Sequence, residues 1–116
     1  MTAHSTPVST ARAFTEAWTS HDMDAAASYL ADDVVFHRPA SHSTGKPAYL
    51  EGLNAFARSV SGMKMVAALG DDRQALIMYV LATPRGTLIC AEHHTFRDGK
   101  IQTDRLTFAE QKAANA

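Results

Sequence analysis

The spacing of apolar residues changes abruptly at Met63, and this change most restricts the folds open to the chain. Before Met63 apolar residues recur every three or four positions, as on one face of a helix, whereas after it they form four short runs of strand character. The separators between these runs contain Asp, Pro and Gly, which favour tight turns. A meander of four antiparallel strands is therefore predicted over MKMVAALG, QALIMYVLA, TLICAEHHTF and IQTDRLTFAE.

Two helices are predicted at the start of the chain. The first begins near Pro7, with Thr6 or a nearby serine as its cap. The second is capped by Asp22, because its carboxylate can accept the free amide protons of the first turn. The pair Asp32-Asp33 is expected to end this second helix.

A short strand and a third helix complete the first half of the chain. VVFHRP is predicted to form a strand that stops at Pro39, and ASHSTG is predicted to be a loop. Pro47 then starts a helix whose apolar face extends to Val60. Three helices followed by a curled sheet predict an α+β domain with the helices on one face of the sheet.

Composition limits the partners of this domain. The 116 residues are expected to form one domain, with a core over 8–110 and frayed ends. The formal charge is −1 and the basic residues are scattered, so neither a nucleic acid nor an anionic membrane is an expected partner. No apolar run approaches the roughly 20 residues needed to cross a bilayer. The single cysteine, Cys90, favours a reducing, cytoplasmic location.

The order of these elements, the segment AWTSHDMDAAASYLADDVVFHRP and the hairpin TFRDGKI resemble the SnoaL-like branch of the nuclear transport factor 2 superfamily, over roughly Val8 to Glu110. The resemblance implies a cone in which three N-terminal helices pack on a strongly curved, mostly antiparallel sheet, with a pocket at the wide end. The superfamily includes ketosteroid isomerases, epoxide hydrolases, polyketide cyclases, ligand-binding proteins and interaction modules, so the fold alone leaves the function open.

The residues at the catalytic positions of these relatives argue against two reactions. Phe14 stands where a ketosteroid isomerase has its hydrogen-bonding tyrosine, and Arg38 stands where it has its proton-abstracting aspartate. Glu92 occupies the position of the second oxyanion-hole acid. Leu106 stands where the epoxide hydrolases have an acid. The resemblance therefore implies neither a typical ketosteroid isomerase nor an epoxide hydrolase of that mechanism.

The final hairpin gathers Glu92, His93, His94, Asp104 and Arg105, and its turn decides which of them share a face. With a two-residue loop at 98–99, Glu92 would lie opposite Arg105 as a solvated ion pair. With a three-residue loop at 97–99, Glu92 would lie opposite Asp104. We favour the second register because its inward face joins the acids to large apolar side chains: Cys90, Glu92, His94, Phe96, Asp104, Leu106 and Phe108.

The inward acids Glu92 and Asp104 predict acid and base chemistry. Two carboxyl groups in a partly dry cavity cannot both ionise cheaply, so one keeps its proton unless a cation lies between them. Arg38, expected to point inward with Phe36, is the candidate cation. If it pairs with Asp104, Glu92 or His94 is left free to act as acid or base near neutral pH. We hypothesise that Asp104 or His94 is the base, that Glu92 donates to a substrate oxygen, and that Arg38 anchors a carbonyl or carboxylate. The reaction would be a cofactor-independent isomerisation, cyclisation or hydrolysis.

The expected substrate is a small, largely apolar organic molecule, because aromatic and methionine side chains are frequent around the expected cavity. The predicted substrate-binding residues are Arg38, Phe14, Trp18, Phe36, Cys90, Leu106 and Phe108.

An alternative without catalysis stays open, because the polar cluster can be a satisfied buried network in a ligand-binding or dimer-forming module. No metal site is expected. His93 and His94 are adjacent on a strand and point to opposite faces, while His37 and His42 span a flexible loop. Cys90 is expected to be a small core side chain rather than a nucleophile.

A second copy of the chain is expected to cover one face of the sheet. If side chains alternate along the strands, the outward face is too apolar to remain in water. A homodimer through the sheet is therefore predicted, with its outward residues including Ile77, Tyr79, Leu81, Ile89 and Ala91.

Overall fold

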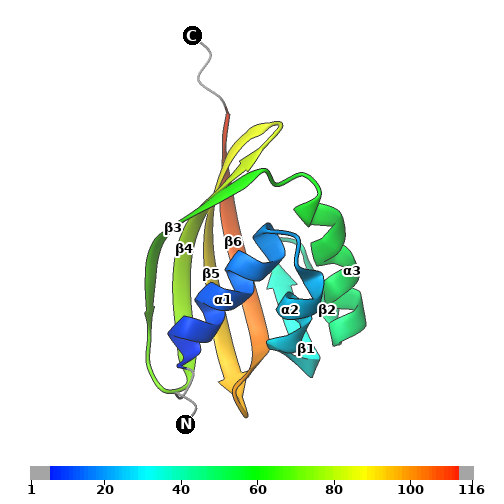
Figure 1. Ribbon diagram of the computed structural model, residues 1–116, viewed down its shortest axis with the longest axis vertical. Helices are drawn as coiled ribbons and strands as arrows, with labels where there is room; N and C mark the ends of the chain where they lie inside the picture. Colours follow the sequence, from blue (N-terminus) through cyan, green and yellow to red (C-terminus); the bar gives the residue numbers. More distant parts are fainter. Residues whose placement is uncertain (1–5, 113–116) are drawn as a thin grey trace.

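The computed structural model describes residues 6–112, which form three helices and one six-stranded sheet (Figure 1). Along the sheet the strand order is β2-β1-β6-β5-β4-β3, and all neighbours are antiparallel except β1 and β6, which are parallel. The elements are α1 (Pro7–Thr19), α2 (Met23–Ser28), β1 (Leu30–Arg38), β2 (Ser41–Thr44), α3 (Lys46–Ala57), β3 (Gly62–Gly70), β4 (Gln74–Thr83), β5 (Gly86–Arg97) and β6 (Lys100–Lys112).

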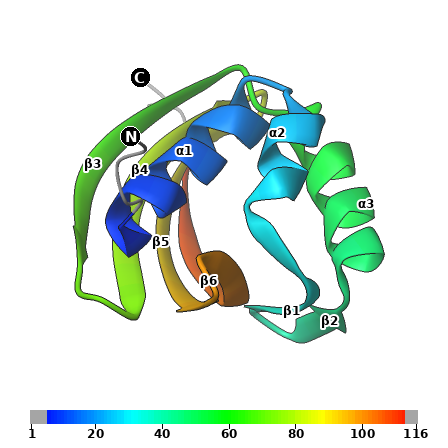
Figure 2. The same cartoon turned by 60° about the horizontal axis from the view of Figure 1, so that its bottom comes forward.

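The sheet is strongly curved, and the helices lie on its concave side (Figure 2). α1 packs against β3, β4 and β5, while α3 packs against β1 and β2. The sheet does not close, because β2 and β3 form its two edges. The α+β cone predicted from the sequence is confirmed.

The starts of the first two helices follow their local sequence signals. Thr6 caps α1 by accepting a hydrogen bond from the amide of Ser9 at 3.1 Å, and Pro7 occupies the first turn. Asp22 caps α2, because its Oδ1 accepts from the amide of Ala25 at 3.1 Å. Both caps were predicted from the residue types alone.

The second helix is shorter than predicted, and the expectation that Asp32-Asp33 ends it is wrong. Both aspartates lie within β1. The amide of Ile101 donates to the carbonyl of Tyr29 at 2.8 Å, and Leu30 pairs with Ile101. Pairing with β6 therefore draws the chain into the sheet one residue after the helix.

The segment predicted as a loop before the third helix is largely the edge strand β2. Pro39 does follow the end of β1, and the chain reverses through Ala40, whose φ is 68°. Arg38 then pairs with Ser41 across a tight hairpin. Since β2 is polar and mostly exposed, it has no hydrophobic alternation by which its strand character could be predicted.

The face predicted for β4 is wrong. Ile77, Tyr79 and Leu81 are buried and point inward, because Tyr79 lies opposite the buried Cys90 and shares its face. The outward face instead carries Leu76, Met78, Val80, Ile89 and Ala91.

Of the ends that were predicted to fray, Gln111 and Lys112 lie within β6. The remaining end residues, 1–5 and 113–116, lie outside the described part of the chain. Within 6–112, none of the helices has the length and apolar character required to cross a membrane.

Candidate functional site

The turn of the β5–β6 hairpin is the two-residue loop at Asp98 and Gly99. Both residues have positive φ, 53° and 76° respectively, which matches the right-handed twist of the flanking strands. Arg97 and Lys100 therefore close the hairpin as its first pair. This turn belongs to the register that we did not favour.

A β-bulge follows the turn at once. Phe96 pairs with Ile101, but the next pair is Thr95 with Thr103, so Gln102 is an extra residue in β6. One inserted residue moves every later side chain of β6 to the opposite face of the sheet.

Both predicted partners of Glu92 are therefore wrong, because Glu92 lies opposite Leu106 rather than Arg105 or Asp104. His94 is the residue that lies opposite Asp104. The bulge nevertheless returns the strand to the inward face of the favoured register, and Glu92, His94 and Asp104 are all buried on that face.

A small cavity lies between α3 and the inward faces of β1, β4, β5 and β6. Its volume is about 70 Å³, which is room for a few water molecules. Its walls are mostly apolar. Most of the predicted site residues line it: Trp18, Phe36, Arg38, Cys90, Glu92, Leu106 and Phe108.

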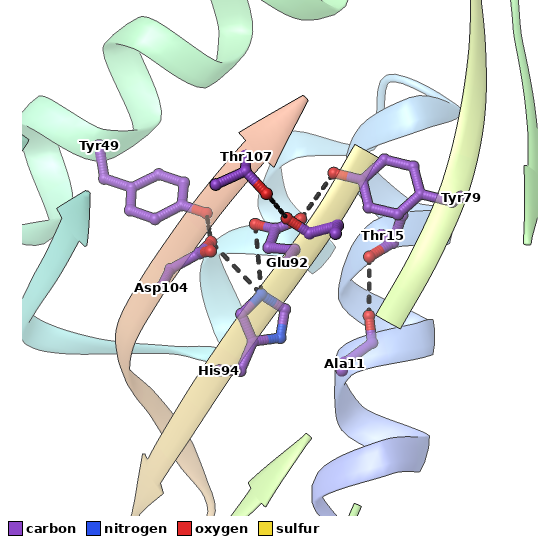
Figure 3. Close-up of polar contacts among 9 residues, drawn as sticks. Ala11, Thr15, Tyr49, Tyr79, Glu92, His94, Asp104 and Thr107 are labelled. Carbon is purple, nitrogen blue, oxygen red and sulfur yellow. Dashed lines mark hydrogen bonds and ion pairs between the residues drawn. The ribbon is translucent and has the colours of Figure 1, made fainter. Parts of the chain in front are cut away.

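Glu92, His94 and Asp104 form one polar cluster beneath this cavity (Figure 3). The Nε2 atom of His94 lies 3.3 Å from Oε2 of Glu92 and 3.3 Å from Oδ2 of Asp104. Two tyrosines reach the cluster from opposite sides. The Tyr79 hydroxyl donates to Oε1 of Glu92 at 2.6 Å, and the Tyr49 hydroxyl donates to Oδ2 of Asp104.

The cluster is deeply buried, and only one of its three members lines the cavity. Glu92 is 3% exposed and lines the cavity, while His94 and Asp104 are 0% exposed and lie behind it. The rings of Phe14 and Phe96 meet the imidazole edge-on. Among the described residues, neither ring nitrogen of His94 nor Oδ1 of Asp104 has a hydrogen-bond partner, and the two contacts of Nε2 are ionic contacts.

The two carboxyl groups of the cluster differ in pKa. Burial alone would raise the pKa of Glu92, but its interactions with Asp104, His94 and Tyr79 outweigh burial and lower the pKa to about 2. Burial and the charge of Glu92 raise the pKa of Asp104 well above its usual range. Of the two carboxyl groups, Glu92 therefore ionises first, and Asp104 holds its proton to a higher pH.

His94 is the cation of this cluster. Burial opposes its charge, but Asp104 and Glu92 together raise its pKa to about 10. A charged imidazole compensates the charge of the ionised Glu92 carboxylate, which burial favours.

Arg38, the candidate cation between the two acids, does not pair with Asp104. The guanidinium of Arg38 lies at the cavity, with its carbon 5.5 Å from the centre of the Phe36 ring, and forms no ion pair with a described carboxylate. The side chain of Asp104 contacts Tyr49 and His94 instead. The cation between the two acids is His94 of β5 and not Arg38 of β1.

Phe14 and Cys90, which were both predicted to bind the substrate, differ in their position relative to the cavity. Phe14 does not line the cavity but packs beneath it, against the rings of Tyr49 and His94. Cys90 lines the cavity, and burial and the charge of Glu92 raise the pKa of its thiol to about 12. A thiol of this pKa is not a nucleophile at neutral pH.

Sequence reasoning assigned no role to Tyr49 and placed Tyr79 on the wrong face. Tyr49 stands four and seven residues before Leu53 and Phe56, so helical spacing could have placed it on the inward face of α3. No local signal identifies its contact with Asp104, because the two residues are 55 positions apart.

The same cluster could offer ligands to a metal ion. Glu92, His94 and Asp104 each present a donor atom, and these atoms lie within 4.8 Å of one another. Nitrogen and carboxylate oxygen suit zinc among other ions. A bound metal would take the oxygen atoms that now face Nε2 of His94, and so would compete with the ionic contacts of the cluster.

The curved sheet, the three helices and the inward cavity define an α+β cone of the nuclear transport factor 2 type. The family model for the SnoaL-like domain matches residues 11–103, and the chain belongs to this family. Among curated proteins, none matches the chain.

Solved structures have the same fold. A protein from Kribbella flavida DSM 17836 is 34% identical, with a TM-score of 0.87 over 91% of this chain and 88% of that chain. An LEH-like epoxide hydrolase from M. tuberculosis is 20% identical, with a TM-score of 0.75 over 89% and 82% of the two chains. A steroid delta-isomerase from Pseudomonas aeruginosa is 18% identical, with a TM-score of 0.76 over 92% and 85%. The similarity to the last two shows the fold alone.

Proposed function

We propose that the cavity binds a small, mostly apolar organic molecule and that the cluster beneath it transfers protons to and from this ligand. The observation that carries the proposal is the position of Glu92, a buried carboxylate that lines an apolar cavity while a second carboxyl group lies behind it. Isomerisation, cyclisation and hydrolysis all use such an acid and base pair without a cofactor. The steroid isomerase and epoxide hydrolase among the structural neighbours support this class of chemistry.

The different pKa values of the two carboxyl groups suggest their roles. Glu92, whose pKa is lowered, is the base, and Asp104, whose pKa is raised, is the acid. This assignment reverses the roles expected from the sequence. Asp104 does not reach the cavity itself, but Tyr49 lines the cavity and its hydroxyl is hydrogen-bonded to Asp104.

Three side chains take part in the proton transfer: Glu92, Tyr49 and Asp104. Glu92 takes a proton from a ligand carbon or from a water molecule. When the ligand binds, the hydroxyl hydrogen of Tyr49 turns from Asp104 to a ligand oxygen and is transferred to it, while the proton of Asp104 moves to the tyrosine oxygen. His94, whose Nε2 contacts both acids, stabilises the negative charge that moves from Glu92 to Asp104.

Exchange of carbon-bound hydrogen tests this proposal without knowledge of the substrate. Small ketones such as cyclopentanone are incubated with the protein in D₂O, and loss of the proton beside the carbonyl is followed by NMR. We expect Glu92→Gln to slow exchange by at least about 100-fold, which is the usual contribution of a general base. His93→Asn is the matched control, because His93 neighbours this site in sequence but points to the other face.

Two controls show whether a loss of exchange is caused only by misfolding or by a damaged cavity. Thermal denaturation of Glu92→Gln and Asp104→Asn shows whether each still folds, and ligand affinity shows whether the cavity is intact. Exchange that proceeds equally in wild type, Glu92→Gln and Asp104→Asn would contradict the proposal.

A second candidate is a ligand-binding module without a reaction. The observation that favours it is that His94 and Asp104 are completely buried and much of the cluster is paired internally. In this case Glu92→Gln and Asp104→Asn reduce stability, and the wild type exchanges no ketone protons although it binds the ligand.

We also propose that a second copy of the chain covers the outward face of the sheet. This face exposes Leu76 and Met78 by 52% and 41%, and Met78 lies opposite Ala91. Light scattering at micromolar concentration is expected to give the mass of a dimer, and Met78→Lys is expected to give a monomer. A monomeric wild type would contradict this proposal.

A further inference from the structure

Arg38 is held at the mouth of the cavity by the local backbone. It is the last residue of β1, and the tight turn through Pro39 and Ala40 pairs it with Ser41. Its guanidinium carbon lies 5.5 Å from the centre of the Phe36 ring, so the side chain folds across an aromatic wall of the cavity.

Within residues 6–112, no carboxylate forms an ion pair with Arg38. All twelve Asp and Glu residues lie within the described part of the chain, and none of them forms an ion pair with Arg38. Other arginines do have such partners, as Arg97 lies 2.7 Å from Asp33. Arg38 is thus a cation without a carboxylate partner among residues 6–112, and it borders a mostly apolar cavity that Glu92 also lines.

The helix on the other side of the mouth leaves room for this guanidinium. Gly52 lies inside α3, where glycine is unfavourable because it gains backbone freedom on unfolding. A β-carbon at this position would stand 3.7 Å from Nη2 of Arg38. A side chain larger than that of alanine would therefore compete with the guanidinium for the space at the mouth.

We propose that Arg38 binds a carboxylate of the ligand, so that the substrate class is a small organic acid with an apolar middle. The inference rests on the proposed function, because it assigns the other end of the same ligand to Glu92 and Tyr49. A guanidinium pairs with a planar carboxylate through two parallel hydrogen bonds, and a single carbonyl uses only one of them. The volume of about 70 Å³ limits the buried part of the ligand to a few heavy atoms.

Equilibrium binding of two matched probes tests the proposal. Hexanoate and hexanamide have the same chain, but only hexanoate is charged at pH 7. Calorimetry at low ionic strength is expected to show hexanoate binding at least tenfold more tightly to the wild type. Arg38→Gln is expected to abolish this preference, Arg38→Lys to keep part of it, and Arg12→Gln to leave it unchanged, because Arg12 is an exposed residue of α1 that does not line the cavity.

Three results would overturn the inference: hexanoate that does not bind the wild type, hexanamide that binds it equally well, or a preference that survives in Arg38→Gln. Thermal denaturation of Arg38→Gln confirms that the variant is folded. The same titration with Glu92→Gln separates this inference from the proposed function, because a preference for hexanoate persists there even if the protein catalyses no proton transfer.

Discussion

The Nε2 atom of His94 lies 3.3 Å from Oδ2 of Asp104, and the two residues face each other directly across β5 and β6. The same nitrogen lies 3.3 Å from Oε2 of Glu92. One buried imidazole thus connects two carboxyl groups, and both the stability of the fold and the proposed chemistry depend on its charge.

The charge of His94 predicts a loss of stability at alkaline pH. Its pKa is raised to about 10 in the folded protein, whereas an imidazole in an unfolded chain titrates near about 6.5. A raised pKa contributes stability that is complete below about 6.5 and is lost as the pH rises through about 10. Urea denaturation is expected to show a free energy of unfolding that falls between pH 7 and 10, and more steeply than in His94→Asn. Equal slopes in the two proteins would contradict a charged imidazole.

The charge of Glu92 predicts the opposite behaviour in acid. Its pKa is lowered to about 2, so the stability it contributes is complete above about 4.3 and is lost as the pH falls towards 2. We expect Glu92→Gln to lose less stability than the wild type between pH 5 and 2. Carbon-13 NMR provides a direct check, since Glu92 should titrate far below Asp104; the reverse order would contradict the acid and base assignment.

Removing the hydroxyl of Tyr79 or of Tyr49 is predicted to reduce the stability of the fold. Tyr79→Phe and Tyr49→Phe each leave a buried carboxyl oxygen without its donor, and each is expected to reduce the free energy of unfolding by about 1–3 kcal/mol. Tyr79→Phe should also raise the pKa of Glu92, because the hydrogen bond from Tyr79 helps to lower it. Tyr29→Phe is the control, and a loss of stability in it as large as in the other two would indicate a general effect of removing hydroxyl groups.

The bulge at Gln102 predicts a large effect from a single deletion. Without this residue, Asp104 and the rest of β6 would point to the opposite face of the sheet. We expect the deletion to prevent cooperative folding, measured by circular dichroism during thermal denaturation. Gly99→Ala changes the same hairpin without altering its register and should cost only about 1 kcal/mol, for the left-handed conformation. A deletion variant as stable as Gly99→Ala would show that the register can adjust.

The thiol of Cys90 predicts low reactivity in the folded protein. It is 2% exposed and its pKa is raised to about 12. At pH 8, Ellman's reagent is expected to label Cys90 at the rate of unfolding, and rapidly in 6 M guanidinium chloride. Rapid labelling of the native protein would indicate that the cavity opens to solvent.

The sequence by itself determined the elements that depend on neighbouring residues. Thr6 and Asp22 cap helices because their side chains reach amides three residues away. Asp98 and Gly99 tolerate positive φ, so the sequence indicated where the hairpin turns, although we favoured a three-residue loop there. The change from helical to strand spacing was sufficient for the α+β class. The order of the elements, with the segments AWTSHDMDAAASYLADDVVFHRP and TFRDGKI, carried the resemblance to the SnoaL-like family, which the family model confirms.

Only the tertiary structure decided the pairing of the strands and the composition of the site. One bulged residue, Gln102, changes the face of every side chain that follows it in β6, and no local pattern distinguishes it from its neighbours. Tyr49 meets Asp104 from 55 residues away, and His94 rather than Arg38 lies between the acids. The physical reason is that local preferences act over a few residues of chain, whereas a buried polar cluster is selected by which side chains the whole sheet brings within hydrogen-bond distance.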